Sequence, residues 1–335
     1  DLSTPEGQDV FHRLVKVSDL FVQNNAVGSM ERLGFTYDVL SELNPRFSMI
    51  SVAGLGQTGP WKEYRGLGYS FESFYGFNSL IGYPDMDADG VPITAPSDAA
   101  TGVTIATAAL MALHQRERTG KGCFVDISLG EAFAPHMGEY FMDYEMNSRI
   151  PERVGNQHVR LVQNIYLCDG HDEWISLTIS NIKQWHTLCT LMGTPALIDD
   201  PRLADLKSLR SLQDEIDEVI TSWTKDKNNL DLFHLLQVNG IPASPIMHEP
   251  MAYADPHLKE RDFFVPITQA DTGTHLYPGT TYKISGIPFT VRKPPVRLGE
   301  DNDYVYREVL GLSDKEYDRL KSMGMIGMDY LPGVP

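Results

Sequence analysis

The residue with the clearest chemical potential is Asp98, an acid placed directly before a predicted helix at residues 99–118. An Asp at this place is a favoured N-cap, because its side chain accepts a hydrogen bond from a free N–H of the first turn. A carboxylate at a helix start can also act as a nucleophile, and the helix N-terminus keeps it ionised. Capping is the more frequent role of such a residue, so both hypotheses stay open on residue type alone.

Cationic side chains near predicted strand ends are few. Arg32, Lys62 and Arg65 lie in or beside loops at these ends. A cation at such a place can bind a ligand phosphate, and the alternative for each is a solvated surface charge.

Residues 54–59 match the G-x-G-x-x-G pattern of dinucleotide-binding loops and follow a predicted strand. The dinucleotide motif needs a helix that opens on the third glycine, but Pro60 and Trp61 come next. No acid is placed on a following strand to bind a ribose. We therefore expect a mobile loop over a site, with a plain surface loop as the alternative.

Other catalytic and metal chemistries find no support in the residue patterns. The ten histidines form no H-E-x-x-H pattern, and no G-x-S-x-G segment occurs. Cys123, Cys168 and Cys189 are too few and too scattered for a disulfide framework or a zinc site. We expect no metal, and a cytoplasmic location follows from this cysteine usage.

Charge and hydropathy exclude two classes of partner. The 335 residues carry 28 Lys+Arg against 45 Asp+Glu, a formal net charge of −17. Nucleic acid and anionic membrane surfaces need a basic face, so neither is expected as a partner. No apolar run reaches the roughly 18 residues that span a bilayer.

Helices and strands alternate in the first part of the chain. Helices are predicted from Pro5, after the hydroxyl of Thr4, and at residues 32–43, 99–118 and 131–146. Strands are predicted at residues 20–22, 47–53 and 124–129. This alternation predicts an α/β layer structure with a mostly parallel sheet.

The pattern changes near residue 149. A hairpin is predicted from strands at 165–167 and 174–179, followed by helices at 183–192, 212–223 and 230–239. Residues 240–245, which read G-I-P-A-S-P, are expected to form a rigid linker. Short strands from residue 263 and a final helix at 303–310 complete the chain.

Taken in order, these motifs resemble the family III CoA-transferases, the group that contains formyl-CoA:oxalate and carnitine CoA-transferases. The matching stretches are residues 4–7, 24–35, 43–46, 51–60, 97–98, 118–122, 125–128, 240–242 and 298–300. Each stretch alone is weak, but the ordered set is specific and covers nearly the whole chain.

The resemblance implies an α/β fold with a Rossmann-like large domain and an inserted smaller α+β domain. It places the large domain at residues 1–148 and 262–335, the small domain at 160–240, and linkers at 149–159 and 241–261. It further implies an interlocked homodimer, with the ligand between the large domain of one subunit and the small domain of its partner. Family members also carry a strand–helix unit ahead of Thr4, which we expect to be absent here.

The resemblance also assigns chemistry to particular residues. Asp98 matches the nucleophile that accepts an acyl group from an acyl-CoA and then holds CoA as an aspartyl thioester. Asn24, Asn25, Ala26 and Arg32 match residues that contact CoA, and Lys62 and Arg65 lie in a segment that contacts it. The implied substrates are an acyl-CoA and a carboxylic acid, with no permanently bound cofactor.

Three departures from the family pattern bear on specificity. The glycine flap of formyl-CoA transferases is missing at residues 159–164, Asp301 stands where a His is frequent, and an acid after Arg65 is absent. These differences place the chain nearer the carnitine-type branch than the oxalate-type branch.

Two alternative functions remain. An α-methylacyl-CoA racemase of the same fold pairs its acid with a His, so that two bases exchange an α-proton. Leu67 stands about where that His belongs, so the second base is lacking. A non-catalytic subunit of a hetero-oligomeric CoA-transferase is the other alternative, and the presence of Asp98 is against it.

Overall fold

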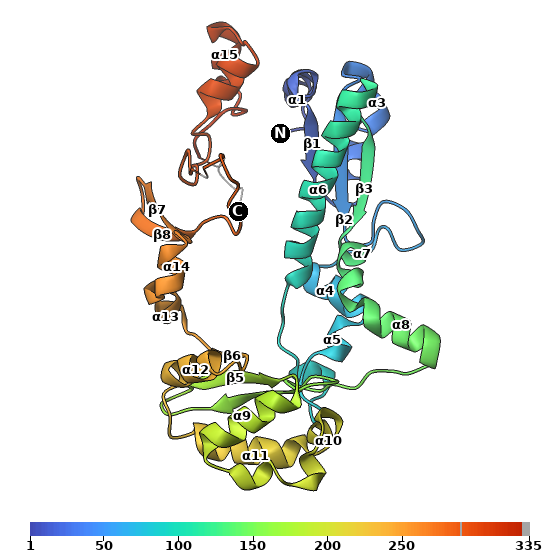
Figure 1. Cartoon of the computed structure of the whole chain (residues 1–335). Coiled ribbons are helices and arrows are strands. Elements are labelled where there is room, and N and C mark those ends of the chain that lie inside the picture. Colours follow the sequence, from blue (N-terminus) through green and yellow to red (C-terminus); the bar gives the residue numbers. More distant parts are fainter. Residues whose placement is uncertain (289, 330–335) are drawn as a thin grey trace. The chain divides into compact units, whose positions relative to one another are not determined.

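The computed structural model describes residues 1–288 and 290–329, and the chain divides into two compact units (Figure 1). The first unit comprises Asp1–Leu80, Ala88–Pro151 and the chain from Lys293 onward. The second comprises Ile81–Asp87 and Glu152–Arg292. The domain bounds implied by the resemblance stay a prediction.

Three parallel strands form the sheet of the first unit, in the order β1-β2-β3. They are β1 Leu20–Gln23, β2 Ser48–Ala53 and β3 Phe124–Ser128. Every residue of β2 is buried, which is typical of a central parallel strand covered on both faces. The predicted strands and their parallel arrangement are confirmed.

Helices cover both faces of this sheet. Met49 packs with Phe11 on one face, and Ile50 and Val52 pack with Ile105 on the other, because successive strand residues point in opposite directions. The helices concerned are α1 Pro5–Val17 and α3 Tyr37–Leu43 on the first face and α6 Pro96–Thr119 on the second. Figure 1 shows α6 running alongside the three strands.

Local chemistry explains where these helices begin and end. The Thr4 hydroxyl accepts a hydrogen bond from Gly7 N at 3.2 Å, as its N-cap position predicts. The helix predicted at 32–43 is instead two helices, α2 Ser29–Arg32 and α3, because Gly34 adopts a positive φ of 82° between them. Pro135 likewise divides the helix predicted at 131–146, since proline lacks the N–H that a continuous helix needs. Its parts are α7 Leu129–Phe133, the 3₁₀ turn η2 Ala134–Met137 and α8 Gly138–Asn147.

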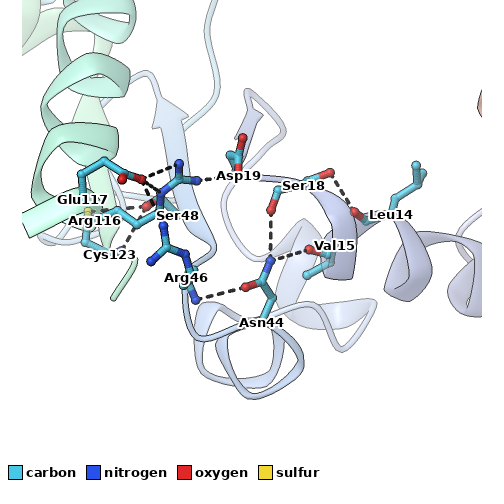
Figure 2. A network of polar contacts seen from close by, with 10 residues as sticks. All are labelled: Leu14, Val15, Ser18, Asp19, Asn44, Arg46, Ser48, Arg116, Glu117 and Cys123. Carbon is cyan, nitrogen blue, oxygen red and sulfur yellow. Dashed lines mark hydrogen bonds and ion pairs between the residues drawn. The ribbon is translucent and has the colours of Figure 1, made fainter. Parts of the chain in front are cut away.

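Polar contacts tie the helices to the amino ends of the strands (Figure 2). Asn44 at the end of α3 donates hydrogen bonds to the carbonyls of Val15 and Ser18, both at 3.0 Å. Arg116 of α6 forms an ion pair with Asp19, just before β1, at 2.6 Å. These contacts stabilise the amino ends of the strands and do not involve the carboxyl ends, where a ligand could bind.

The second unit is built on a three-stranded antiparallel sheet in the order β4-β5-β6. Strands β4 Val162–Leu167 and β5 Trp174–Ile179 form the predicted hairpin, with Leu167 opposite Trp174. The predicted helices are confirmed as α9 Ile182–Met192, α11 Gln213–Thr224 and α12 Asn229–Val238, with α10 Leu206–Ser211 and the 3₁₀ turns η3 Pro195–Leu197 and η4 Pro201–Leu203 between them.

The prediction of a rigid linker at residues 240–245 is wrong. Residues Ala243–Pro245 form β6, which pairs with β5 so that Leu177 lies opposite Ala243. Ile241 is completely buried in the core of this unit. Ile241 and Ala243, on either side of Pro242, therefore belong to the core and the sheet of this unit. The linker prediction rested on the two prolines.

The remaining elements are short. They are α4 Gly68–Phe74, α5 Phe77–Leu80 and η1 Ala88–Gly90 in the first unit, and α13 Glu249–Ala254, α14 Pro256–Glu260, β7 Phe264–Gln269 and β8 Gly273–Pro278 in the second. The expected tail helix is the π-helical segment η5 Tyr304–Val309, and a further helix, α15 Asp314–Ser322, follows it. The sequence analysis missed α15 although Ser313 and Glu316 form a capping box at its start.

Candidate functional site

A cavity of about 590 Å³ opens at the carboxyl ends of the three parallel strands. Its wall includes the segment after β1, Ala53 and Gly54 at the end of β2, and Leu129 directly after β3. Ligands of open parallel sheets bind outside the carboxyl ends of the strands, so this is the expected place for a site. All the lining residues belong to the first unit.

The structure brings every predicted site residue to this one cavity. The lining residues among the predictions are Asn24, Asn25, Ala26, Arg32, Lys62, Arg65 and Asp98. They come from three separate stretches of the chain, and the fold gathers them at one edge of the sheet. Their roles stay predictions.

Asp98 is not the N-cap of its helix. The helix begins at Pro96 with Ala95 in the cap position, so Asp98 is the third helical residue. The residue is exposed and lines the cavity, in the first turn of a 24-residue helix. The structure thus removes the capping role that residue type favoured.

Two residues of α4 hold the first turn of α6 in place. The Glu72 carboxylate accepts a hydrogen bond from Ser97 N, with Oε1 and N 2.9 Å apart. Gly68 lies so close that a Cβ added there would be 2.6 Å from Oδ1 of Asp98. An added Cβ would therefore displace the Asp98 carboxylate, which glycine at position 68 leaves in place.

Charge in the cavity runs against the charge of the whole chain. Three cations, Arg32, Lys62 and Arg65, share the wall with two acids, Glu63 and Asp98. The local excess of one positive charge contrasts with the net charge of −17. Cations concentrated in a cleft raise the local concentration of an anionic ligand.

Side-chain amides fix the segment that follows β1. The Oε1 atom of Gln23 accepts a hydrogen bond from Asn25 N at 2.7 Å. The amide groups of Gln23 and Gln57 both donate to the hydroxyl of Ser51 in β2. The backbone of a predicted ligand-binding residue is therefore anchored to the central strand.

The glycine-rich loop at 54–59 lies against the end of β3. Gln57 N donates to both carboxylate oxygens of Asp126, at 3.0 and 3.1 Å, and the Ser128 hydroxyl donates to the carbonyl of Gly54. No helix opens on Gly59. The Asp126 carboxylate takes a backbone N–H that a nucleotide phosphate would need, which is a physical reason against a dinucleotide site.

The sequence analysis missed several residues of the site. Gly68, Phe71 and Leu129 line the cavity, and Glu72 lies behind it, completely buried. The sequence carries one indication of Glu72, which is an acid in a stretch rich in aromatic residues, with Phe71 directly before it and Phe74 two residues after it.

Leu67, which stands about where racemases carry a His, lines the cavity and is 81% exposed. Among the residues that the structure describes, no histidine lines this cavity. Among these described lining residues the one further carboxylate is that of Glu63, so the pairing of an acid with a His that a racemase uses is lacking.

In residues 1–288 and 290–329, no group of three or more His, Cys, Asp or Glu side chains is arranged to hold a metal ion. In the same part of the chain, no helix combines the length and apolarity needed to cross a membrane.

Comparisons with known proteins agree with this architecture. The model of CoA-transferase family III matches residues 1–302. Succinyl-CoA–D-citramalate CoA-transferase of Chloroflexus aurantiacus is 31% identical over 328 residues, covering 97% of this chain and 81% of that protein. Succinate–glutarate CoA-transferase of Agrobacterium fabrum is 31% identical over 314 residues, covering 92% and 77%. The crystal structure of a CAIB/BAIF family protein from Brucella suis superposes with a TM-score of 0.83 at 26% identity, covering 92% of this chain and 80% of that one.

Proposed function

The chain belongs to CoA-transferase family III and is a CoA-transferase, and we propose that it transfers CoA between carboxylic acids through covalent intermediates on Asp98. The observation that supports this most directly is the exposed Asp98 carboxylate in a cavity with three cations. A carboxylate is suited to the task because it can form both an anhydride and a thioester.

The proposed sequence begins with acyl transfer to the enzyme. A carboxylate oxygen of Asp98 attacks the thioester carbonyl of the acyl-CoA, and the C–S bond breaks to give a mixed anhydride and CoA thiolate. The thiolate then attacks Cγ of Asp98, which forms an aspartyl-CoA thioester and releases the first acid as its carboxylate.

The second half runs the same steps in reverse. The acceptor carboxylate attacks Cγ of Asp98, forming a new anhydride and expelling CoA thiolate. The thiolate attacks the acceptor carbonyl, giving the new acyl-CoA and restoring the Asp98 carboxylate. No net proton is taken up, so the scheme needs no second base.

Binding of CoA falls to the residues that the resemblance assigned. We propose that Arg32, Lys62 and Arg65 hold the phosphates, and that Asn24, Asn25 and Ala26 contact the rest of the molecule. Charge-assisted hydrogen bonds to phosphate are about twice as strong as neutral ones, so a few such side chains suffice. CoA is thus a substrate and not a resident cofactor.

The acids exchanged are proposed to be short dicarboxylates. The two relatives described above are named for succinyl-CoA or succinate with citramalate or glutarate. A screen of succinyl-CoA against glutarate, citramalate, oxalate and carnitine-like acids identifies the acceptor. Preference for a carnitine-like acid would contradict this substrate class.

The assembly is proposed to be an interlocked homodimer acting in the cytoplasm. The free thiols of Cys123, Cys168 and Cys189 suit a reducing compartment. Light scattering of the purified chain should give twice the mass of one chain. A monomer that transfers CoA at full rate would contradict the dimer, and activity found only with a second polypeptide would favour the hetero-oligomer.

Substitution of Asp98 tests the covalent mechanism. We expect Asp98→Asn to lower kcat by at least about 10⁴-fold, because no intermediate can form on the amide. Hydroxylamine should inactivate the wild-type enzyme only with acyl-CoA present, leaving a hydroxamate on Asp98. Glu139→Gln is the matched control, since Glu139 is also an exposed acid in the first turn of a helix.

Full activity of Asp98→Asn would refute the covalent mechanism. Incubation of acyl-CoA in deuterated water without an acceptor separates the racemase alternative. α-Deuterium uptake at a catalytic rate would favour the racemase.

A further inference from the structure

Glu72 is a completely buried carboxylate that the proposed chemistry does not use. It lies in α4 and is 0% exposed, and its Oε1 atom accepts the hydrogen bond from Ser97 N at 2.9 Å. Its other oxygen, Oε2, is buried without a hydrogen-bond partner among the residues that the structure describes. Burying an ionisable group with one unpaired oxygen is unfavourable, so its presence calls for a physical reason.

The position of Glu72 on α4 relates it to Asp98. Gly68 and Glu72 are four residues apart and therefore lie on one face of the helix. Gly68 approaches the Asp98 carboxylate, and Glu72 bonds the backbone of Ser97, the residue before Asp98. This face of α4 thus contacts two consecutive residues at the start of α6.

The start of α6 lacks a cap of its own. Ala95 occupies the N-cap position without a capping side chain, and Pro96 has no N–H. The N–H of Ser97 is therefore the first donor of the helix, and it has no acceptor within the helix. Glu72, 25 residues earlier in the chain, supplies that acceptor.

Fixing the backbone of Ser97 constrains the position of the Asp98 Cα, because the peptide unit between them is rigid and planar. Asp98 must first attack a thioester carbonyl, and its Cγ must then be reached by the CoA thiolate and by the acceptor carboxylate, so the reaction depends on accurate placement. Misplacement of a reacting group by about 1 Å can cost about a hundredfold in rate.

We propose that Glu72 is a positioning residue for Asp98, acting as an acceptor from another helix that holds the first turn of α6 in its reactive orientation. This inference rests on the proposed function of Asp98. Glu72 touches no reacting atom, and its effect passes through the backbone of Ser97. An amide at this position keeps an acceptor, whereas a shorter or apolar side chain leaves the N–H of Ser97 unpaired.

Three variants of the full-length enzyme test the placement of the acceptor. Glu72→Gln replaces the carboxyl group by an amide on a side chain of the same length, Glu72→Asp keeps the carboxyl group on a shorter side chain, and Glu72→Ala removes the acceptor. Steady-state kcat and KM for acyl-CoA are measured, together with the single-turnover rate of hydroxylamine trapping on Asp98. Asn181→Ala is the matched control, because it removes the cap of α9, where Asn181 accepts from Gln184 N at 3.0 Å.

We expect Glu72→Asp and Glu72→Ala to lower kcat and the trapping rate by about ten- to a hundredfold, with KM for acyl-CoA nearly unchanged. Glu72→Gln should stay within about threefold of wild type, because a neutral acceptor retains much of the hydrogen bond. The Asn181→Ala control should alter thermal stability alone.

Wild-type kcat in a folded Glu72→Asp or Glu72→Ala enzyme would overturn the proposal. Equal losses in the Asp and Gln variants would also overturn it, since the acceptor would then not be what matters. If Glu72→Ala does not fold, the comparison of the Asp and Gln variants decides the question. Asp98→Asn is assayed in parallel to distinguish failure of the Asp98 mechanism from failure of the Glu72 proposal. Full activity of Asp98→Asn refutes the covalent function of Asp98. An inactive Asp98→Asn enzyme beside fully active Glu72 variants refutes only the positioning role of Glu72.

Discussion

Gly68→Ala is the substitution whose effect follows most directly from the geometry of the site. The backbone of Gly68 is not in the left-handed region, so alanine fits the main chain. The added Cβ would, however, be 2.6 Å from Oδ1 of Asp98 and 3.1 Å from both Cγ of Asp98 and Oγ of Ser97. The substitution therefore perturbs the candidate nucleophile and leaves the local backbone permitted.

The size of the effect follows from these distances. Atoms in favourable contact lie about 3.5 Å apart or more, so the carboxylate and the new methyl group must separate by about 0.9 Å. A displacement of this size corresponds to about a hundredfold in kcat, or about 2.7 kcal/mol in the barrier. Alanine is favoured over glycine within a helix by up to about 1 kcal/mol, which offsets part of the strain. We expect a folded enzyme with low kcat.

The assay compares kcat and the melting temperature of Gly68→Ala with those of Gly138→Ala. Gly138 is the matched control because it is likewise the first residue of a short helix, and nothing lies within 4 Å of its added Cβ. A folded Gly68→Ala enzyme with wild-type kcat would refute the reasoning, since the contact with Asp98 would then have no consequence. An equal loss in Gly138→Ala would refute it as well.

Four further predictions concern ligand binding, helix capping, thiol reactivity and the pH dependence of stability. Arg32→Ala should raise KM for acyl-CoA by about tenfold with kcat unchanged, because a phosphate contact is the same in ground and transition states. The control is Arg46→Ala, since the Arg46 side chain pairs with Glu117 at the far end of the sheet, and this variant should leave KM as it is. Equal changes of KM in the two variants would contradict the phosphate-binding role of Arg32. Asn228→Ala should lower the melting temperature by about 2–4 °C without changing kcat, since Asn228 caps α12 through Leu230 N and Asp231 N, and an unchanged melting curve would contradict this capping role. Burial raises the pKa of Cys168 to about 11 and that of Cys189 to about 12. A thiol reagent at pH 8 should therefore label Cys123 first and the other two cysteines only on unfolding. Equal labelling rates of the three thiols in the folded protein would contradict this prediction. Because the pKa of Cys168 is raised from 9.0 to about 11 in the folded chain, between these pH values the thiol ionises in the unfolded chain and stays protonated in the folded one. The free energy of unfolding should therefore fall as the pH rises from 9.0 toward about 11, which pH-dependent unfolding measures.

Much of the fold follows from local features that can be recognised directly in the sequence. Thr4 before Pro5 starts a helix, Gly120 ends one with a φ of 73°, and the hairpin at Leu167 and Trp174 follows from alternating apolar residues around a polar turn. These features depend on neighbours within a few residues. The prolines at 242 and 245 indicated a linker, but pairing with β5 makes residues Ala243–Pro245 a strand of the sheet.

The site combines both kinds of information. The ordered motifs identified the family, and the resemblance pointed to seven of the residues that line the cavity, because each matches a family position or segment in the linear chain. The sequence alone also established the acidic charge and the missing histidine at Leu67. Only the tertiary structure decided that α6 begins at Pro96, that Gly68 touches Asp98, and that Glu72 caps the helix from 25 residues away. Residue types next to Asp98 predicted a cap, but the partner that completes the helix start comes from another element, and only packing brings the two together.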